Sequence, residues 1–427
     1  YATGVAPRLS GMSVRYLTTE DFASYRTMAS GAFGGSFDPA VPGAAKDFAP
    51  GQTAIGIDAS SLPGGLDEVI AAGARIRHDH VTLGGGLAGC GGVAGLAVHP
   101  AHRGDGLFDQ LLTAVIARCD AEGLPLSMLY PSNPAIYRRR GYQVVARTQS
   151  LIVPLVDLQR IRAVPDRRLV PVTEATMPRL RALYHRLSTH DNAMLRREAP
   201  LFDEGLPGDG WAALLLEDAS GVDHGYLSWS RRGEAADGVG IDVHELRGRT
   251  RTDHLALLRS LGSWSTVTEL ARLRVRTEDP VLDALPGGGA RPDPSPVPLV
   301  MMRVIDTAAV LQARPAPAGL EGAVRLVVED DTVPAHTCRA AGSFLVSVAD
   351  GRVRAERDST AARDSTAERG VLGTIRLDIH AASLLLVGGR SLADARRLDL
   401  GAQADPAAET FLDALLAGPR PSVMDSF

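Results

Sequence analysis

The stretch of residues 95–121 constrains the fold of this chain more than any other. A short apolar run at 95–98 leads into a polar turn that contains Gly104 and Gly106, and a helix-like pattern follows at once. Its apolar positions recur at the helical period: Leu107, Leu111, Leu112, Val115, Ile116 and Cys119. The sequence therefore predicts a strand, a glycine turn and a helix in direct succession, which is the building unit of an α/β sheet.

The glycine turn predicts an anion-binding site at the start of this helix. The first amide groups of a helix have no partners within it and lie at the positive end of the helix dipole. The absence of side chains at Gly104 and Gly106 would let a phosphorylated ligand lie directly on those amides. These glycines alone leave open the alternative of a simple turn, so the prediction needs support from the residues that follow.

Support comes from a strand and a short helix further along. Residues 124–130 are apolar and predict a strand. Ser132 or Asn133 then caps a short helix that has Pro134 in its first turn. Tyr137 lies at the middle of this helix.

Stretches rich in proline or glycine at 153–171 and 285–298 divide the sequence into three segments. Helices are expected near 21–32, 107–120, 177–187, 253–261, 392 and 409, and strands near 67–98, 124–130, after 142, 211–218, 225–230, 239–245, 270–276, 324–329 and 344–348. The first two segments repeat one order of elements. A chain of 427 residues is too long for a single core, so several α/β units with mixed α+β sheets are expected.

Composition argues against several classes of protein. No apolar run approaches the roughly 18 residues that a membrane-spanning helix requires, and no secretory signal is visible, so a cytoplasmic protein without membrane association is expected. The formal net charge is −5 and the basic residues are scattered, which argues against a nucleic-acid partner. Cys90, Cys119 and Cys338 are far apart and lack the spacing of a metal site, so no metal is expected.

Two further patterns are interpreted as structural. GGGLAG at 84–89 precedes a strand instead of opening a helix, so it predicts a hairpin turn and not a dinucleotide site. His78 and His80 flank Asp79 in an alternating pattern that is typical of a solvated strand edge, and no third metal ligand is indicated.

The succession of strand, glycine turn, helix, strand and tyrosine-containing helix resembles the acyl-CoA site of the GCN5-related N-acetyltransferases (GNAT). Their motif Arg/Gln-x-x-Gly-x-Gly/Ala corresponds to RGDGLF at 103–108, although Phe108 places a bulky residue where the backbone usually approaches the pyrophosphate. In this interpretation the backbone at 96–98 holds the thioester and pantetheine, and the amides of 103–108 hold the pyrophosphate. The predicted acetyl-CoA-binding residues are Leu96, Ala97, Val98, Arg103, Gly104, Asp105, Gly106, Leu107, Phe108, Ser132 and Asn133.

Longer stretches narrow the resemblance to the enhanced intracellular survival (Eis) family of aminoglycoside acetyltransferases. They are VAGLAVHPAHRGDGLF, AIYRRRGY, DPVLDALPGGGARPDPSPVPLVMMRVIDTAAVLQAR and a final phenylalanine. The resemblance implies two tandem GNAT-like domains, of which only the first binds acetyl-CoA, then a C-terminal domain like a sterol carrier protein, assembled as a homo-hexamer. The corresponding ranges are 1–155, 156–298 and 299–427. The central domain is consistent with a GNAT-like domain that does not bind acetyl-CoA, because its helix in HELRGRTRTDHLALL begins without a glycine turn.

The same resemblance assigns the catalytic groups. Tyr137 would be the general acid that protonates the coenzyme A thiolate, and the carboxylate of Phe427 would be the general base. An α-carboxylate has a reference pKa of about 3.3–3.7, so it needs burial or a bridging water to accept a proton from an ammonium group. The alternatives are a core aromatic at Tyr137 and a frayed tail, which Pro419 and Pro421 keep extended.

The expected function is thus acetyl-CoA-dependent N-acetylation of the primary amines of an aminoglycoside or another small polyamine-like acceptor. Gly104 and Asp105 replace two arginines of the family loop and Ser426 stands where the family often has an acidic residue, which weakens the case for a polycation. Acetylation of lysine in peptides, and a non-catalytic small-molecule-binding protein with a vestigial acetyltransferase domain, are the alternatives.

Overall fold

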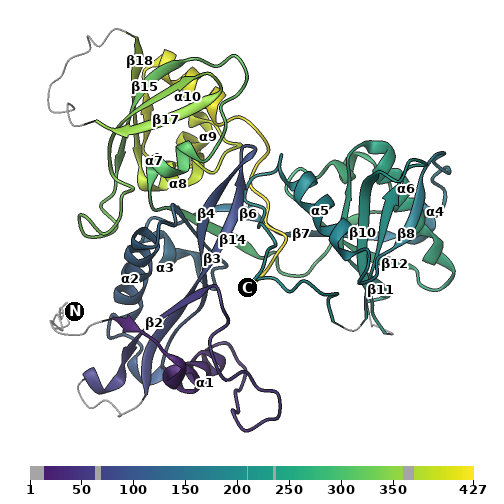
Figure 1. Cartoon of the computed structure of the whole chain (residues 1–427), viewed down its shortest axis with the longest axis horizontal. Coiled ribbons are helices and arrows are strands. Elements are labelled where there is room, and N and C mark those ends of the chain that lie inside the picture. Colours follow the sequence, from purple (N-terminus) through teal and green to yellow (C-terminus); the bar gives the residue numbers. More distant parts are fainter. Residues whose placement is uncertain (1–13, 63–68, 209, 234–236, 359–369) are drawn as a thin grey trace.

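The computed structural model describes residues 14–62, 69–208, 210–233, 237–358 and 370–427. They form three units, each built on its own mixed sheet, and Figure 1 shows these units grouped around the point where the chain ends. The fold is therefore the mixed α/β architecture expected from the sequence. Every helix in these ranges is too short or too polar to cross a membrane.

The first unit contains a seven-stranded sheet of order β1-β2-β3-β4-β5-β14-β6. Its strands are β1 (Arg15–Tyr16), β2 (Gln52–Asp58), β3 (Ile70–Leu83), β4 (Gly86–Val98), β5 (Leu126–Leu129), β6 (Gln143–Arg147) and β14 (Leu299–Val304). Its helices are α1 (Phe22–Ala32), α2 (Leu107–Ala121) and α3 (Pro134–Arg138). Helix α2 follows the predicted pattern, because its buried side chains are those of the apolar stripe. The GGGLAG segment forms the predicted β3–β4 hairpin.

The second unit contains a seven-stranded sheet of order β13-β7-β12-β11-β10-β9-β8. Its strands are β7 (Gln149–Pro154), β8 (Arg168–Pro171), β9 (Trp211–Glu217), β10 (Asp223–Arg231), β11 (Val239–Gly248), β12 (Leu270–Val275) and β13 (Arg291–Pro292). Its helices are α4 (Leu155–Gln159), α5 (Met177–Ser188) and α6 (Arg251–Gly262). The two sheets share one pattern, since their pairs are antiparallel except for β4–β5 in the first and β11–β12 in the second.

The third unit contains a five-stranded sheet of order β17-β16-β15-β18-β19. Its strands are β15 (Gly322–Glu329), β16 (Gly342–Ala349), β17 (Arg352–Arg357), β18 (Val371–Asp378) and β19 (Ala402–Ala404), and its helices are α7 (Thr307–Gln312), α8 (Ile379–Leu385), α9 (Leu392–Arg397) and α10 (Pro406–Leu415). Its buried side chains join those of β5, β6 and β14 in one continuous core.

The units exchange strands at their junctions. Strand β7 leaves the first unit and pairs with β12 in the second sheet, whereas β14 returns from the second unit and inserts between β5 and β6. The stretch 153–171 is not the open linker that its composition suggests, because it forms α4, which buries Leu155 and Leu158, and β8. The ranges 1–155, 156–298 and 299–427 remain predictions for how the chain divides.

Candidate active site

The end of β4, where this strand separates from β5, forms one wall of the candidate site. The parallel pairing of these strands runs from Cys90↔Leu126 to Gly92↔Met128 and then stops, while β4 continues to Val98. A register shift in β4 accompanies the separation, and the Tyr25 hydroxyl donates to the carbonyl of Gly95 at 2.9 Å. On the side facing β5, the backbone of 96–98 thus has no partner strand among the described residues, as the sequence interpretation requires.

The start of α2 forms the second wall. Gly106 is the N-cap of the helix with φ of 79°, and Gly104 has φ of 99°, a region that L side chains rarely adopt. A Cβ added at either position would meet nothing within 4 Å. The backbone conformation, and not crowding, therefore calls for glycine here, and the first residues of the helix line open space.

These walls enclose a cavity of about 560 Å³. The lining includes most of the predicted residues, namely Leu96, Ala97, Val98, Arg103, Gly104, Gly106, Leu107, Phe108, Ser132 and Tyr137. Asp105 and Asn133 do not line it. The Asp105 carboxylate lies 3.6 Å from Nδ1 of His102, and the Asn133 side chain caps α3 by accepting from the amide of Ala135 at 3.1 Å. Asn133 thus holds the backbone at the start of α3 beside the cavity.

Tyr137 lies on α3 with its ring mostly buried, at 6% exposure, yet it lines the cavity. Burial raises the pKa of its hydroxyl. Its ring packs edge-to-face on Phe108, with centroids 5.5 Å apart, and on Tyr142 at 6.2 Å. The bulky residue that departs from the GNAT motif therefore packs against this tyrosine and fixes its orientation.

The tail from Gly418 to Phe427 is extended, as predicted, and is bound along its length instead of being frayed. The side chains of Asn192, Thr277, Thr148 and Tyr130 donate to the carbonyls of Pro419, Pro421, Val423 and Asp425 respectively. Figure 1 shows it running from the third unit down between the other two. Its end is thereby fixed beside the first sheet.

The Phe427 ring lies where β4 and β5 separate. It packs edge-to-face on Tyr130, with centroids 5.6 Å apart, and the Arg77 guanidinium lies 4.8 Å from its centre. A Cβ at Gly92, the last residue of β4 that pairs with β5, would lie 2.6 Å from Oδ2 of Asp79 and 3.0 Å from this ring, so the carboxylate and the ring together leave no room for a side chain. The structure thus places Phe427 at the closed end of the gap and Tyr137 in the cavity beyond it; no described contact joins them.

Arg77 and Asp79 are site residues that sequence reasoning missed. The Asp79 carboxylate is 1% exposed and accepts from Nε and Nη2 of Arg77, both at 3.0 Å. The Arg77 guanidinium of this pair lies over the Phe427 ring. The alternating pair interpreted as solvated is His78 and His80, of which His80 is exposed, whereas Asp79 between them is buried. The alternation of side chains along a strand could have indicated the ion pair, because it places Arg77 and Asp79 on one face of the strand and His78 on the other.

A second cavity, of about 490 Å³, adjoins the tail at Met424, Asp425 and Ser426. Aromatic residues form much of its wall: Tyr184, Phe202, Trp211 and Tyr226. Its carboxylates Glu245, which is buried, and Asp425, which is partly buried, both pair with Arg197, and further arginines line it at Arg181 and Arg274. This cavity ends one residue from Phe427 and is large enough for a small acceptor molecule.

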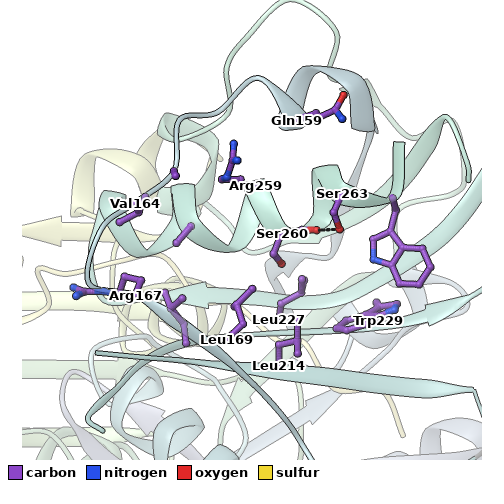
Figure 2. Close-up of a pocket in the computed structure, with 14 residues that line it drawn as sticks. Gln159, Val164, Arg167, Leu169, Leu214, Leu227, Trp229, Arg259, Ser260 and Ser263 are labelled. Atoms are coloured by element: carbon purple, nitrogen blue, oxygen red, sulfur yellow. Dashed lines mark hydrogen bonds between the residues drawn. The ribbon is translucent and has the colours of Figure 1, made fainter. Parts of the chain in front are cut away.

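Among the described residues, the corresponding helix of the second unit, α6, begins without the glycine turn that precedes α2. Thr250 caps α6, and the Asp253 carboxylate accepts from the amide of Thr250 at 3.0 Å and from Nε of Arg167 at 2.9 Å. An acidic side chain therefore occupies the helix start where a phosphate would have to bind. A cavity of about 740 Å³ lies between α6 and the sheet, where Figure 2 shows Leu169, Leu214, Leu227 and Trp229 along its floor. Its apolar floor does not suit a diphosphate.

Comparison with known proteins agrees with this geometry. Residues 13–145 match an acetyltransferase (GNAT) domain, and residues 307–424 match a sterol carrier protein domain. The N-acetyltransferases Eis of Mycobacterium tuberculosis and Mycobacterium bovis are 25% identical over 414 residues, which cover 92% of this chain and 97% of theirs.

Solved structures extend the likeness of the fold to the whole chain. A GCN5-related N-acetyltransferase from Anabaena variabilis superimposes with a TM-score of 0.79 at 19% identity, covering 97% of this chain and 100% of that one. Eis1 from Mycobacterium abscessus gives a TM-score of 0.69 at 20% identity, with the same coverage. The chain is therefore an acetyltransferase that carries a GNAT domain at 13–145 and a domain of the sterol carrier type at 307–424. The resemblance to the Eis family that the sequence predicted is confirmed.

Proposed function

We propose that this chain transfers the acetyl group of acetyl-CoA to a primary amine of a small molecule. The observation that carries the proposal is one cavity in which the open start of α2, the unpaired backbone of β4 and Tyr137 meet. The α2 amides would hold the diphosphate, and the backbone at 96–98 would hold the pantetheine and orient the thioester carbonyl.

The transfer forms a C–N bond and breaks a C–S bond, so one proton leaves the amine and one reaches the sulfur. In this mechanism Tyr137 donates its phenolic proton to the departing thiolate. In a chain that ends at Phe427, the carboxylate next to the Phe427 ring accepts the proton from the amine. Both groups are on fixed supports, α3 for the phenol and the bound tail for the carboxylate.

The acceptor site in this proposal is the cavity beside the tail. The family resemblance implies an aminoglycoside or polyamine acceptor, whereas Arg181, Arg197 and Arg274 stand beside the carboxylates there. Release of free thiol from acetyl-CoA should be measured with an aminoglycoside, spermidine, an aromatic monoamine and a lysine peptide. Turnover with a small amine supports the proposal. Turnover with the peptide alone favours a protein lysine acetyltransferase, and no turnover with any amine favours a binding protein.

Replacing Gly106 by glutamate is expected to weaken acetyl-CoA binding. The new carboxylate stands at the open start of α2, where it repels the diphosphate and competes with it for the helix amides. We expect Kd for acetyl-CoA to rise about tenfold to thirtyfold, corresponding to roughly 1.4–2 kcal/mol. Isothermal titration calorimetry measures this directly.

Gly123→Glu is the matched control. Gly123 lies at the other end of α2 with φ of 69°, and a Cβ there also meets nothing within 4 Å. Both variants therefore carry a similar backbone strain and the same added charge. Equal weakening of acetyl-CoA binding in the two variants would show that the diphosphate does not lie at Gly106.

We expect that ionisation of Tyr137 does not lower kcat as the pH rises through the neutral and mildly alkaline range. A general acid must be protonated, and burial raises the pKa of this phenol above its ordinary value of about 10, so it stays protonated through the neutral and mildly alkaline range. We expect kcat at saturating substrates to rise with pH and then stay level up to pH of about 9.5. A fall near neutral pH that disappears in Tyr137→Phe would contradict this assignment.

A further inference from the structure

A cleft of about 710 Å³ lies on the far side of α3 from the acetyl-CoA cavity. Its floor is apolar and comes from β6 of the first unit and from Leu398 and Leu400 of the third. Strand β6 is the edge strand of the first sheet, so its outer side faces this cleft without a partner strand in the part of the chain that the structure describes. Helix α3 separates the two spaces, since Arg138 lines the cleft whereas Tyr137 and Arg139 line the other cavity.

Basic side chains from distant parts of the sequence converge on this cleft, and among the described residues no carboxylate lines it. They are Arg138, Arg147, His380, Arg390 and Arg420. Nε of Arg420 lies 3.4 Å from the carboxylate of Glu278, whose side chain is 59% exposed. Within the described ranges, Arg138, Arg147 and Arg390 have no ion pair. The chain as a whole carries a net charge of −5, so this concentration of positive charge is local.

Arg390 is the basic group of this cleft whose charge is least compensated. It is partly buried, its Nε is enclosed without a hydrogen-bond acceptor, and burial together with the nearby Arg420 lowers its pKa, although Asp394 and Glu278 act in the opposite direction. Like charges that converge in a partly desolvated space repel one another, and a bound anion removes that cost.

We propose that this cleft binds a small phosphorylated molecule that carries at least two negative charges. Guanidinium groups match phosphate oxygens in a fork geometry and form charge-assisted hydrogen bonds with them. The volume suits a small ligand, and the apolar floor accepts a non-phosphate part of it. The site is separate from the acetyl-CoA cavity and does not depend on the proposed function.

Occupancy of the cleft also acts on the tail. Arg420 stands between Pro419 and Pro421, whose carbonyls are held by Asn192 and Thr277, and the same tail ends at Phe427. A ligand bound to Arg420 and Arg147 therefore joins the tail to the first sheet. The anion should raise the temperature of thermal unfolding of the full chain.

The test uses inorganic tripolyphosphate and the full chain, with coenzyme A present at saturation to fill the other cavity. Calorimetry should show one site per chain in the wild type. Arg147→Gln combined with Arg390→Gln should weaken binding at least about a hundredfold, because each charge-assisted contact contributes about tenfold or more. The control, Arg352→Gln combined with Arg354→Gln, removes the same charge from exposed positions on β17 and should bind like the wild type.

Each other outcome overturns the proposal. Absence of binding to the wild type refutes the site, and equal weakening in the control variant shows only non-specific attraction. Binding that disappears when coenzyme A is added places the anion in the acetyl-CoA cavity. If Arg147→Gln and Arg390→Gln change the oligomeric state and leave tripolyphosphate binding intact, the cleft is an interface between copies. If the double variant does not fold, the binding test uses Arg147→Gln alone, because Arg147 lies at an exposed strand end.

Discussion

Tyr137→Phe is expected to lower kcat by about 10²–10³-fold while Kd for acetyl-CoA stays nearly unchanged. The substitution removes only the hydroxyl, so the packing of the ring on Phe108 and Tyr142 is kept. Without the phenol, the thiolate must leave unprotonated or take its proton from water. Single-turnover kinetics with the best amine acceptor, together with calorimetric titration of acetyl-CoA, separate the chemical step from binding.

Tyr142→Phe is the matched control for this experiment. Its ring neighbours Tyr137, but its hydroxyl is fully buried and hydrogen-bonded to Ser127 at 2.8 Å, outside the cavity lining. This variant should lose about 1 kcal/mol of stability and retain kcat. If Tyr137→Phe retains kcat as well, the tyrosine is not the general acid. If both variants lose it equally, the effect comes from packing.

The sequence predicted those parts of the fold that depend on local chemistry. Helix α2 follows from the period of its apolar residues, and its start follows from Gly106, because an L side chain is strained in the backbone conformation found there. Helix α3 follows from its Asn133 cap and Pro134. Helix α8 shows the limit of this reasoning, since it is buried on nearly all sides and so has no polar face to mark its period.

Contacts between distant segments were beyond prediction from one sequence. The insertion of β14 between β5 and β6 depends on pairing across more than one unit, and no local pattern encodes it. The contacts of Phe427 likewise join segments that are far apart in the sequence. Gly92, Tyr130 and the pair Arg77–Asp79 become neighbours of the tail only after the units have assembled.

Chain length at the tail should affect catalysis as strongly as Tyr137 does. In a chain that ends at Phe427, two added glycines would leave the ring on Tyr130 and Arg77 and move the terminal carboxylate away from the gap between β4 and β5. If that carboxylate is the general base, kcat should fall by about 10²-fold or more, with acetyl-CoA binding preserved.

Phe427→Leu is the control for the extended chain, because it keeps the carboxylate and loses only the aromatic contacts with Tyr130 and Arg77. Its kcat should fall far less than that of the extended chain, since the tail upstream remains bound through Thr148 and Thr277. Full activity in the extended protein would instead remove the carboxylate from the mechanism. The proton would then have to leave the amine through water, and the buried tail would serve only to shape the acceptor cavity at Met424 and Asp425.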